Sequence, residues 1–326
     1  MSKLKVSVVG AGHLGSIHTK LWSLNPNVEL VGIFDVDKEK SNKISNDYNC
    51  TNFNSIEEVI ENSDATTIAV PTIYHWEVAK QCIQSGKHCL IEKPITNTYQ
   101  ESIDLIESAK KNKVLIQVGH VERFNPAIKA IKAYNINPLF IEAHRLSQFK
   151  PRALDVSVIH DLMIHDIDII LWLAKSKITN IDANGVSVLS DSIDIANARL
   201  KFENGLTANI TASRISANPM RKMRIFQKDA YISLDFQEQN VEIYKIYDEG
   251  LNSTDGVPAM MLGSIDTGSN NRNIYFEKPH IDKINAIAEE QNAFVAAIQD
   301  NIPIAVNANE ASEALRVAEE IVKIIG

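Results

Sequence analysis

A glycine-rich turn near the N-terminus constrains the fold of this chain more than any other feature. An apolar run over residues 4–9 leads into GAGHLG at 10–15, and a helix-like segment follows. Gly10 permits a tight turn off a strand, Gly12 lets the backbone approach a pyrophosphate, and Gly15 lets the helix pack closely on the strand. The helix N-terminus would then present N–H groups and partial positive charge to the phosphates.

An acidic residue follows the second apolar run, at 28–34. Asp35 lies twenty residues after Gly15, where a carboxylate can hydrogen-bond both hydroxyls of a ribose. It would repel a 2′-phosphate, so the sequence predicts NAD over NADP as the cofactor. A purely structural glycine-rich turn is the alternative, because GxGxxG alone is a weak signal. The residues expected to contact the dinucleotide here are Gly10, Gly12, His13, Leu14, Gly15 and Asp35.

Strand and helix signals alternate over the first 118 residues, which predicts a doubly wound parallel sheet in an NAD-binding Rossmann domain over 1–120. The expected strands are 4–9, 28–34, 65–70, 88–91 and 114–118. The expected helices are 14–24, 38–47, 55–62, 74–85 and 99–112.

The pattern changes after residue 120, where strand-like runs follow one another without intervening helices. This predicts a second, α+β domain over 121–326 with an antiparallel or mixed sheet. Asn204-Gly205 is a hairpin signal, and Asn307 or Asn309 is expected to cap the last helix. The expected elements are strands at 138–149, 194–203, 206–214, 222–228 and 230–236, an irregular segment at 247–279, and helices at 157–174, 281–300 and 308–325.

Composition limits the class of protein. The chain has 326 residues, 44% of them hydrophobic, and a formal net charge of −8, which argues against bulk nucleic-acid binding. No apolar run approaches the length of a membrane span, and the first strand begins too early to leave room for a signal peptide. The three cysteines lack CxxC spacing and are typical of reduced thiols. We therefore expect a cytoplasmic protein that binds neither nucleic acid nor membrane.

The run at 88–91 ends in Glu92-Lys93-Pro94. Ligands of open parallel sheets bind at the carboxyl ends of the strands, so Lys93 is expected to face the nicotinamide. The alternative is a solvated lysine at a strand end.

Residues 155–168 place ionisable side chains in an otherwise apolar helix. Asp161 and His165 are four residues apart and would share a helix face. Burying such groups is costly unless they are paired or used, and a histidine can exchange protons near neutral pH. A core histidine with a capping Asp is one alternative. A zinc site is another, although the sequence offers no second ligand cluster.

Two basic clusters stand out in an acidic chain. Because Arg binds phosphate or carboxylate in a bidentate manner, they indicate an anionic small substrate, with solvated surface faces as the alternative. The clusters are Arg123, Lys129, Lys132, Arg145, Lys150 and Arg152, and Arg214, Arg221, Lys222, Arg224 and Lys228.

Over nearly its whole length the chain resembles the glucose–fructose oxidoreductase / inositol dehydrogenase / MocA (Gfo/Idh/MocA) family. The matching motifs are GAGHLG at 10–15, AVPTIYHWEVA at 69–79, GKHCLIEKP at 86–94, GHVERFNP at 119–126 and DLMIHDID at 161–168. The resemblance implies an N-terminal Rossmann domain and a C-terminal domain, over 121–326, that has an open, mostly antiparallel sheet and serves substrate binding and oligomerisation. Such sheets commonly pack face to face in homodimers or homotetramers.

The resemblance also implies roles for individual residues. Lys93, in the EKP motif with Glu92, would lie near the nicotinamide and the reacting hydroxyl. Asp161 and His165 match the DxxxH pair, with His165 as the acid/base. Three residues match the loop that passes the cofactor ribose: Pro71, Thr72 and His75.

Within the family, the motifs at 119–126, 151–158 and 161–171 are most similar to UDP-N-acetylglucosamine 3-dehydrogenases. This implies oxidation of the sugar 3-hydroxyl to a ketone, which a transaminase can convert to a 3-amino sugar, for example for lipid A. A dehydrogenase of a free polyol such as an inositol, one acting on a uronic acid derivative, and a non-catalytic NAD-binding regulator are the alternatives. No metal is expected, and the candidate substrate contacts are Arg123, Asn125, Arg145 and Arg152.

Overall fold

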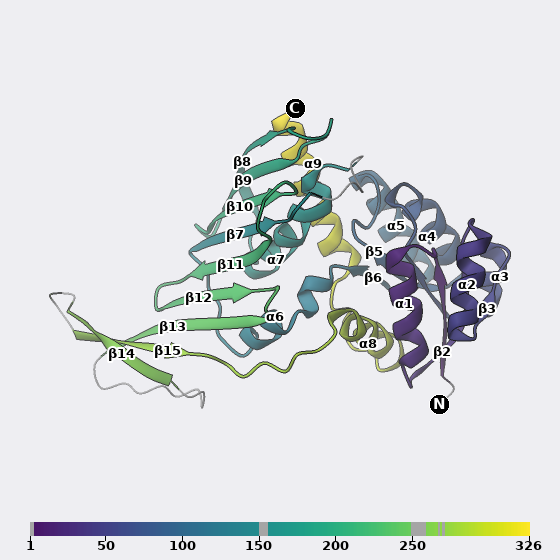
Figure 1. Cartoon of the computed structure of the whole chain (residues 1–326), viewed down its shortest axis with the longest axis horizontal. Helices are drawn as coiled ribbons and strands as arrows, with labels where there is room; N and C mark the ends of the chain where they lie inside the picture. Colours follow the sequence, from purple (N-terminus) through teal and green to yellow (C-terminus); the bar gives the residue numbers. More distant parts are fainter. Residues whose placement is uncertain (1–2, 150–155, 249–258, 267, 269–270) are drawn as a thin grey trace. The chain divides into compact units, whose positions relative to one another are not determined.

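A computed structural model describes residues 3–149, 156–248, 259–266, 268 and 271–326. The chain divides into two compact units, here called unit 1 and unit 2 (Figure 1). Unit 1 comprises residues 1–121 and 285–319, and unit 2 comprises 122–284 and 320–326. This differs from the expected division at residue 120 in one respect, because residues 285–319 pack with the N-terminal part.

Unit 1 contains a six-stranded parallel sheet in the order β3-β2-β1-β4-β5-β6. The predicted doubly wound sheet is confirmed, and right-handed crossovers place α1 and α2 on one face and α3, α4 and α5 on the other. The strands are β1 (Leu4–Val9), β2 (Val28–Phe34), β3 (Thr51–Asn52), β4 (Ala65–Ile68), β5 (His88–Glu92) and β6 (Ile116–Gly119). The helices are α1 (His13–Leu24), α2 (Lys38–Tyr48), α3 (Ile56–Asn62), α4 (His75–Gln84), α5 (Tyr99–Asn112) and α8 (Ala286–Gln299).

The core of unit 1 draws on both ends of the chain. Val6 and Val8 of β1 are fully buried, as expected for a strand covered on both faces. Phe294 and Val295 of α8 belong to the same hydrophobic cluster. Helix α8 therefore completes the core that the N-terminal strands begin.

Unit 2 contains a nine-stranded sheet in the order β14-β15-β13-β12-β11-β7-β10-β9-β8. Its β7 and β10 run parallel and all its other neighbours are antiparallel, which confirms the open, mostly antiparallel sheet. The strands are β7 (Phe140–Leu146), β8 (Ile178–Val186), β9 (Ile195–Phe202), β10 (Thr207–Ser213), β11 (Met220–Phe226), β12 (Ala230–Asp235), β13 (Asn240–Asp248), β14 (Ala259–Asp266) and β15 (Asn271–Glu277).

Helices cover one face of this sheet. Helix α7 (Ile164–Ala174) contacts β7 and β10, and α6 (Pro126–Ile131) contacts β12 and β13. The turn between β9 and β10 contains Gly205 with φ +87°, which confirms the Asn204-Gly205 hairpin. Asn307 caps α9 (Ala308–Ile325), since its side-chain oxygen accepts from two N–H groups of the first turn.

The prediction of an irregular segment over 247–279 is wrong for most of its described residues, because β14 and β15 form a hairpin, here called the β14–β15 arm (Figure 1). Side chains of β14 are exposed on both faces, so the strand lacks the alternation of buried and exposed residues that reveals a strand in a sequence. Strands β8 and β13 were also not anticipated as separate elements. Among the described residues no helix is long and apolar enough to cross a membrane.

Candidate active site

The turn between β1 and α1 is built around two glycines that no other residue can replace. Gly10 has φ +108°, and its N–H donates to the Phe34 carbonyl over 2.8 Å. A Cβ on Gly10 would overlap the Ala69 carbonyl, and one on Gly15 would overlap the Gly10 carbonyl oxygen. The predicted tight turn and close helix–strand packing are therefore present.

Gly12 occupies the N-cap of α1 and leaves open space, since a Cβ there would meet nothing within 4 Å. It has no side chain to cap the N–H groups of the first turn, and that turn holds no acid. A bare helix N-terminus beside a glycine suits the pyrophosphate of NAD. In contrast, side chains cap the nearby helices α2, α3 and α5, namely Asp37, Ser55 and Thr98.

Asp35 follows β2 and is fixed by the backbone around it. Its two carboxylate oxygens accept N–H groups of Ala11 at 2.5 Å and Asp37 at 2.8 Å. The first contact joins the carboxylate to the glycine turn and so fixes the acid beside the segment expected to hold the pyrophosphate. His13 and Leu14 lie exposed in the first turn of α1. Contacts of these residues with NAD stay predictions.

His75 holds together the two loops expected to border the cofactor. Its Nδ1 lies 2.8 Å from the Pro94 carbonyl and its Nε2 lies 2.9 Å from the Val70 carbonyl. The side chain is buried, which lowers its pKa despite the neighbouring carbonyls. His75 thus braces the segment after Lys93 against the loop that carries Pro71 and Thr72, and its contact with a ribose stays a prediction.

Glu92, at the end of β5, belongs to a buried network that sequence reasoning missed. Its Oε1 lies 2.8 Å from Nε2 of His18 on α1, and the His18 ring also meets Gln291 of α8. Burial opposes ionisation of Glu92, but the hydrogen bond from His18, together with the charge and the backbone N–H of Lys93, outweighs it and holds the pKa of Glu92 below its usual range. The sequence feature that could have indicated this network is His18, which lies on the buried face of α1.

The segment that carries Asp161 and His165 begins with a π-helical turn, Ile159–Met163, before α7. The N–H of Ile164 donates to the Ile159 carbonyl, so the prediction of one regular helix over 157–174 is wrong at its first turn. Asp161 and His165 are half-buried, whereas Met163 is fully buried. Isolated π-turns occur frequently at functional sites.

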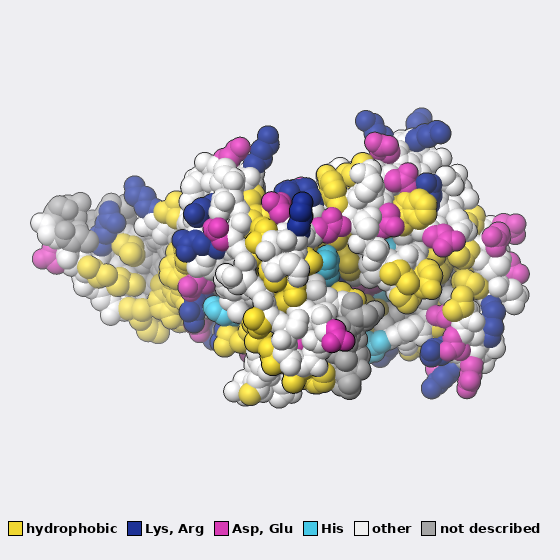
Figure 2. All heavy atoms as spheres, turned by 90° about the horizontal axis from the view of Figure 1, so that it is seen from above, with side chains coloured by type: hydrophobic (Ala, Val, Ile, Leu, Met, Phe, Trp, Pro, Cys, Tyr) yellow, Lys and Arg dark blue, Asp and Glu magenta, His cyan; other side chains and the backbone are white. Residues whose placement is uncertain are grey.

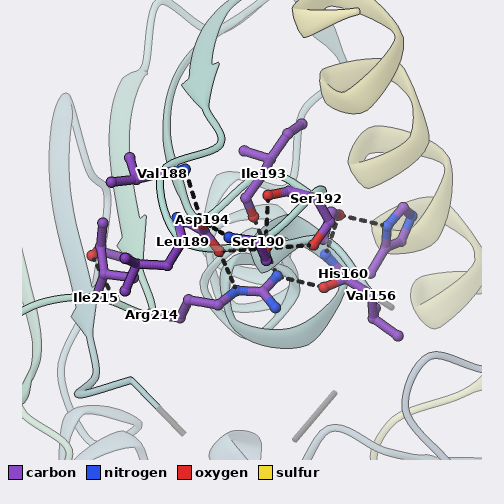
Figure 3. A network of polar contacts seen from close by, with 12 residues as sticks. Val156, His160, Val188, Leu189, Ser190, Ser192, Ile193, Asp194, Arg214 and Ile215 are labelled. Carbon is purple, nitrogen blue, oxygen red and sulfur yellow. Dashed lines mark hydrogen bonds and ion pairs between the residues drawn. The ribbon is translucent and has the colours of Figure 1, made fainter. Parts of the chain in front are cut away.

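Asp194 organises the loop over 187–193 that lies beside this π-turn (Figure 3). Its carboxylate accepts the N–H groups of Val188, Leu189 and Ser190 over 2.8, 2.7 and 3.0 Å. Burial raises the pKa of Asp194, but these donors outweigh it and hold the pKa well below its usual range.

Arg214 joins that loop to the start of the π-turn (Figure 3). It donates to the carbonyls of Val156 and Ile193, and its Nε lies 3.6 Å from the Asp194 carboxylate. The N–H of Val158 also donates to the Ile193 carbonyl over 3.0 Å. The entry to the helix bearing Asp161 is therefore anchored within unit 2.

The expected substrate residues Arg123 and Arg145 are engaged by buried acids. Arg123 forms a bidentate pair with Asp168 at 2.6 and 2.9 Å. Arg145 forms one with Asp166 at 2.8 and 3.0 Å, and a third bond to Glu122 at 2.8 Å. Burial alone would lower the pKa of Arg145, but these two acids hold it above its usual range.

Asn125, the third expected substrate residue, serves as a structural cap. Its side-chain oxygen accepts the Ala127 N–H at the start of α6, and its amide donates to Glu122 and the Phe236 carbonyl. The fourth, Arg152, lies outside the described residues.

Buried acids in unit 2 thus neutralise two arginines of the first basic cluster, Arg123 and Arg145, and binding of an anionic substrate by the clusters stays a prediction. Acids also lie beside four members of the second cluster: Arg214, Arg221, Lys222 and Arg224. Within the described ranges, no three His, Cys, Asp or Glu side chains gather as metal ligands. The three cysteines are free of disulfides.

Comparison with known proteins identifies the family. Residues 4–120 match the GFO_IDH_MocA oxidoreductase family with an NAD-binding Rossmann fold, and residues 128–233 match the GFO/IDH/MocA C-terminal domain. This chain belongs to the Gfo/Idh/MocA family of NAD-binding oxidoreductases. The glycine turn, Asp35 and the EKP motif of this family member are therefore parts of an NAD-dependent enzyme.

Two characterised relatives differ in how much of the chain they match. UDP-N-acetylglucosamine 3-dehydrogenase of Acidithiobacillus ferrooxidans is 34% identical over 93% of this chain and 91% of that protein. A solved structure of that enzyme covers 100% of this chain and 98% of its own, with a TM-score of 0.88 and 32% identity. The NAD-dependent scyllo-inositol 2-dehydrogenase of Bacillus subtilis is 28% identical over 66% of this chain and 68% of its own.

Proposed function

We propose that this enzyme oxidises the 3-hydroxyl of UDP-N-acetylglucosamine to a ketone with NAD⁺. The observation that carries the proposal is the similarity to the Acidithiobacillus ferrooxidans enzyme over 93% of the chain. The EKP lysine and the DxxxH pair support it, because both are present in the motifs of this sequence.

The proposed chemistry assigns one role to each of three side chains. NAD⁺, when bound, supplies the hydride acceptor. His165 takes the proton of the reacting hydroxyl as general base. Lys93 hydrogen-bonds that oxygen and stabilises its developing negative charge. Asp161 orients the sugar or His165.

Oxidation of a free polyol is the second candidate. It is favoured by the pairing of Arg123 and Arg145 with buried acids, which leaves these two guanidinium groups poorly suited to a diphosphate. The B. subtilis inositol dehydrogenase shows that the family includes such enzymes.

Absorbance of NADH distinguishes the two candidates. UDP-N-acetylglucosamine, free N-acetylglucosamine and a free inositol are each incubated with NAD⁺, with a coupled transaminase to draw off the ketone. Turnover with the nucleotide sugar alone supports the proposal, and turnover with the polyol alone replaces it by the second candidate.

The residue assignments are tested separately. We expect Lys93→Ala and His165→Ala each to lower kcat by at least about 100-fold, the range of acid–base contributions, while NAD⁺ still binds. Turnover near the wild-type value in either variant, with normal NAD⁺ binding, contradicts its role.

We further propose a homodimer or homotetramer formed through the outer face of the unit 2 sheet. A ladder of aromatic rings crosses this face with centroid spacings of 5.0–6.0 Å, and it consists of Phe140, Phe226, Tyr231, Tyr244 and Phe276. Figure 2 shows hydrophobic side chains at the surface near the β14–β15 arm, where Met260 is 62% exposed. Light scattering of Phe226→Glu should show dissociation, and an unchanged mass contradicts this interface.

The 3-keto product is a substrate for transamination, so we propose that the enzyme precedes an aminotransferase that makes a 3-amino sugar, as in lipid A with amide-linked chains.

We also propose a cytoplasmic location, which the free thiols Cys50, Cys82 and Cys89 support. Subcellular fractionation and sugar-nucleotide analysis of a deletion strain test both statements.

A further inference from the structure

A chain of three buried polar side chains links the cofactor-binding helix to the strand end that carries Lys93. His18 of α1 is 0% exposed and Gln291 of α8 is 1% exposed, while the Glu92 side chain is 11% exposed. Polar groups buried in this way must be hydrogen-bonded to one another, or they destabilise the fold. The three residues come from segments far apart in the sequence, yet all lie within unit 1.

The contacts of Gln291 determine which nitrogen of His18 carries the proton. The Gln291 amide nitrogen lies 3.2 Å from the His18 carbonyl oxygen and 3.1 Å from its Nδ1. The backbone carbonyl oxygen of His18 can only accept a hydrogen bond, so the group of Gln291 beside it must be a donor. The NH₂ group of Gln291, and not its amide oxygen, therefore faces His18. Nδ1 is then the acceptor, and the proton lies on Nε2, 2.8 Å from Glu92.

Glu92 connects this histidine to Lys93. Its second oxygen, Oε2, lies 3.3 Å from the backbone N–H of Lys93, and a Cβ on Gly119 would approach that oxygen to 3.0 Å. The charge of Lys93 is among the causes that keep the pKa of Glu92 low. Glu290 is also buried, and burial followed by the charge of Glu92 raises its pKa. Glu92 is therefore the ionised member of the two carboxyl groups.

We propose that His18 is a positioning residue for Lys93, because it donates a hydrogen bond that holds the Glu92 carboxylate in place beside that lysine. The inference rests on the proposed role of Lys93 in the reaction. It also gives α8 a role, since Gln291 fixes the tautomer that allows His18 to donate.

The first measurement needs neither NAD⁺ nor sugar. The rate at which acetic anhydride labels Lys93 is measured by mass spectrometry in the wild type, His18→Leu and His18→Gln. His18→Leu removes the donor, so we expect at least a threefold change in the Lys93 labelling rate. His18→Gln places an amide donor near the position of Nε2 and should restore a rate close to the wild type.

Trp22→Phe is the matched control. Trp22 lies on the same helix, is 1% exposed, and donates a buried hydrogen bond to Thr67 over 2.9 Å. Its loss weakens the packing of α1 without touching Glu92, so the Lys93 labelling rate should stay at the wild-type value. Equal labelling in His18→Leu and Trp22→Phe overturns the inference.

Kinetics provide the second measurement. We expect His18→Leu to lower kcat at least tenfold with KM for the sugar and Kd for NAD⁺ changed less than threefold. In His18→Leu/Glu92→Gln the effects should be strongly non-additive, since both act on one contact. If the reductions in kcat caused by the two substitutions are additive, the inference is overturned. If His18→Leu does not fold, Gln291→Leu is used in its place, with the same expected results. If Lys93→Ala instead retains full turnover, the proposed function of Lys93 fails, while the labelling still tests the coupling.

Discussion

The glycine turn of unit 1 and helix α7 of unit 2 both place polar groups against an apolar core, but different kinds of substitution would disrupt them. The turn has no room for added atoms at two positions, because Cβ atoms on Gly10 and Gly15 would overlap backbone carbonyls. Helix α7 cannot lose charge, because Asp166 and Asp168 are 1% exposed and each is balanced by one arginine. The first region is limited by space and the second by electrostatics.

Gly15→Ala should have the largest effect. The new Cβ overlaps the Gly10 carbonyl, so α1 must move away from β1, and we expect a loss of more than about 4 kcal/mol in unfolding free energy together with loss of NAD⁺ binding. Gly12→Ala is the control, since open space surrounds that position. It should melt like the wild type but bind NAD⁺ weakly. Equal melting temperatures of the two variants contradict the steric account.

Arg145→Met should follow in size. It leaves Asp166 and Glu122 buried without their cation, which we expect to cost about 3–5 kcal/mol in urea unfolding. Arg224→Met removes an arginine–glutamate pair at the surface, in which the arginine is 49% exposed and lies 3.6 Å from the Glu142 carboxylate, and it should cost less than about 1 kcal/mol. If the two variants lose similar stability, burial is not what makes the α7 pairs important.

Asp194→Asn tests whether the loop held by the Asp194 carboxylate depends on charge, as helix α7 does, or only on space, as the glycine turn does. We expect a loss of about 1–3 kcal/mol at pH 7, because charge-assisted hydrogen bonds are weakened. The pKa of Asp194 is lowered on folding, so its contribution is complete above the unfolded value of about 3.9 and is lost as the pH falls toward the folded value. The stability difference between variant and wild type should therefore stay constant from pH 7 to about pH 5 and shrink as the pH falls below about 4, and a difference that does not shrink there contradicts the charge effect.

Asp35→Asn should have the smallest effect. The amide keeps one acceptor oxygen but loses the negative charge. We therefore expect the affinity for NAD⁺ to fall about tenfold, equivalent to about 1.4 kcal/mol. The ratio of the affinities for NAD⁺ and NADP⁺ should also become smaller, because the charge that repels the 2′-phosphate is gone. Fluorescence titration with both cofactors measures this, with Asp37→Asn as the neighbouring control. An unchanged preference shows that another group excludes the 2′-phosphate.

The two regions also differ in how far the sequence revealed them. The glycine turn, Asp35 and five of the six strands of unit 1 were predicted because their residues are contiguous and their pattern is set by local geometry, whereas β3, with only two residues, was missed. The partners of Asp166 and Asp168 lie 21 and 45 residues away, so the sequence displayed the arginines as two basic clusters with no indication of which acids neutralise them.

Other features were missed for related reasons. The β14–β15 arm has no buried face over β14, so it lacks the alternation by which strands are recognised. The His18–Glu92–Gln291 contacts join three distant segments, and residue spacing carries no trace of them. The π-turn before α7 depends on a single shifted hydrogen bond within an apolar run that equally suits a regular helix.

The return of residues 285–319 to unit 1 affects how the protein is made. The ribosome releases the strands of the first sheet long before Phe294 and Val295, which complete the same hydrophobic cluster. All of unit 2 up to residue 284 is synthesised in between, so this hydrophobic cluster stays incomplete until α8 has been made. Translation that stops short of α8 would leave a nascent chain with its glycine turn and Lys93 already made but with the helix that covers His18 still missing.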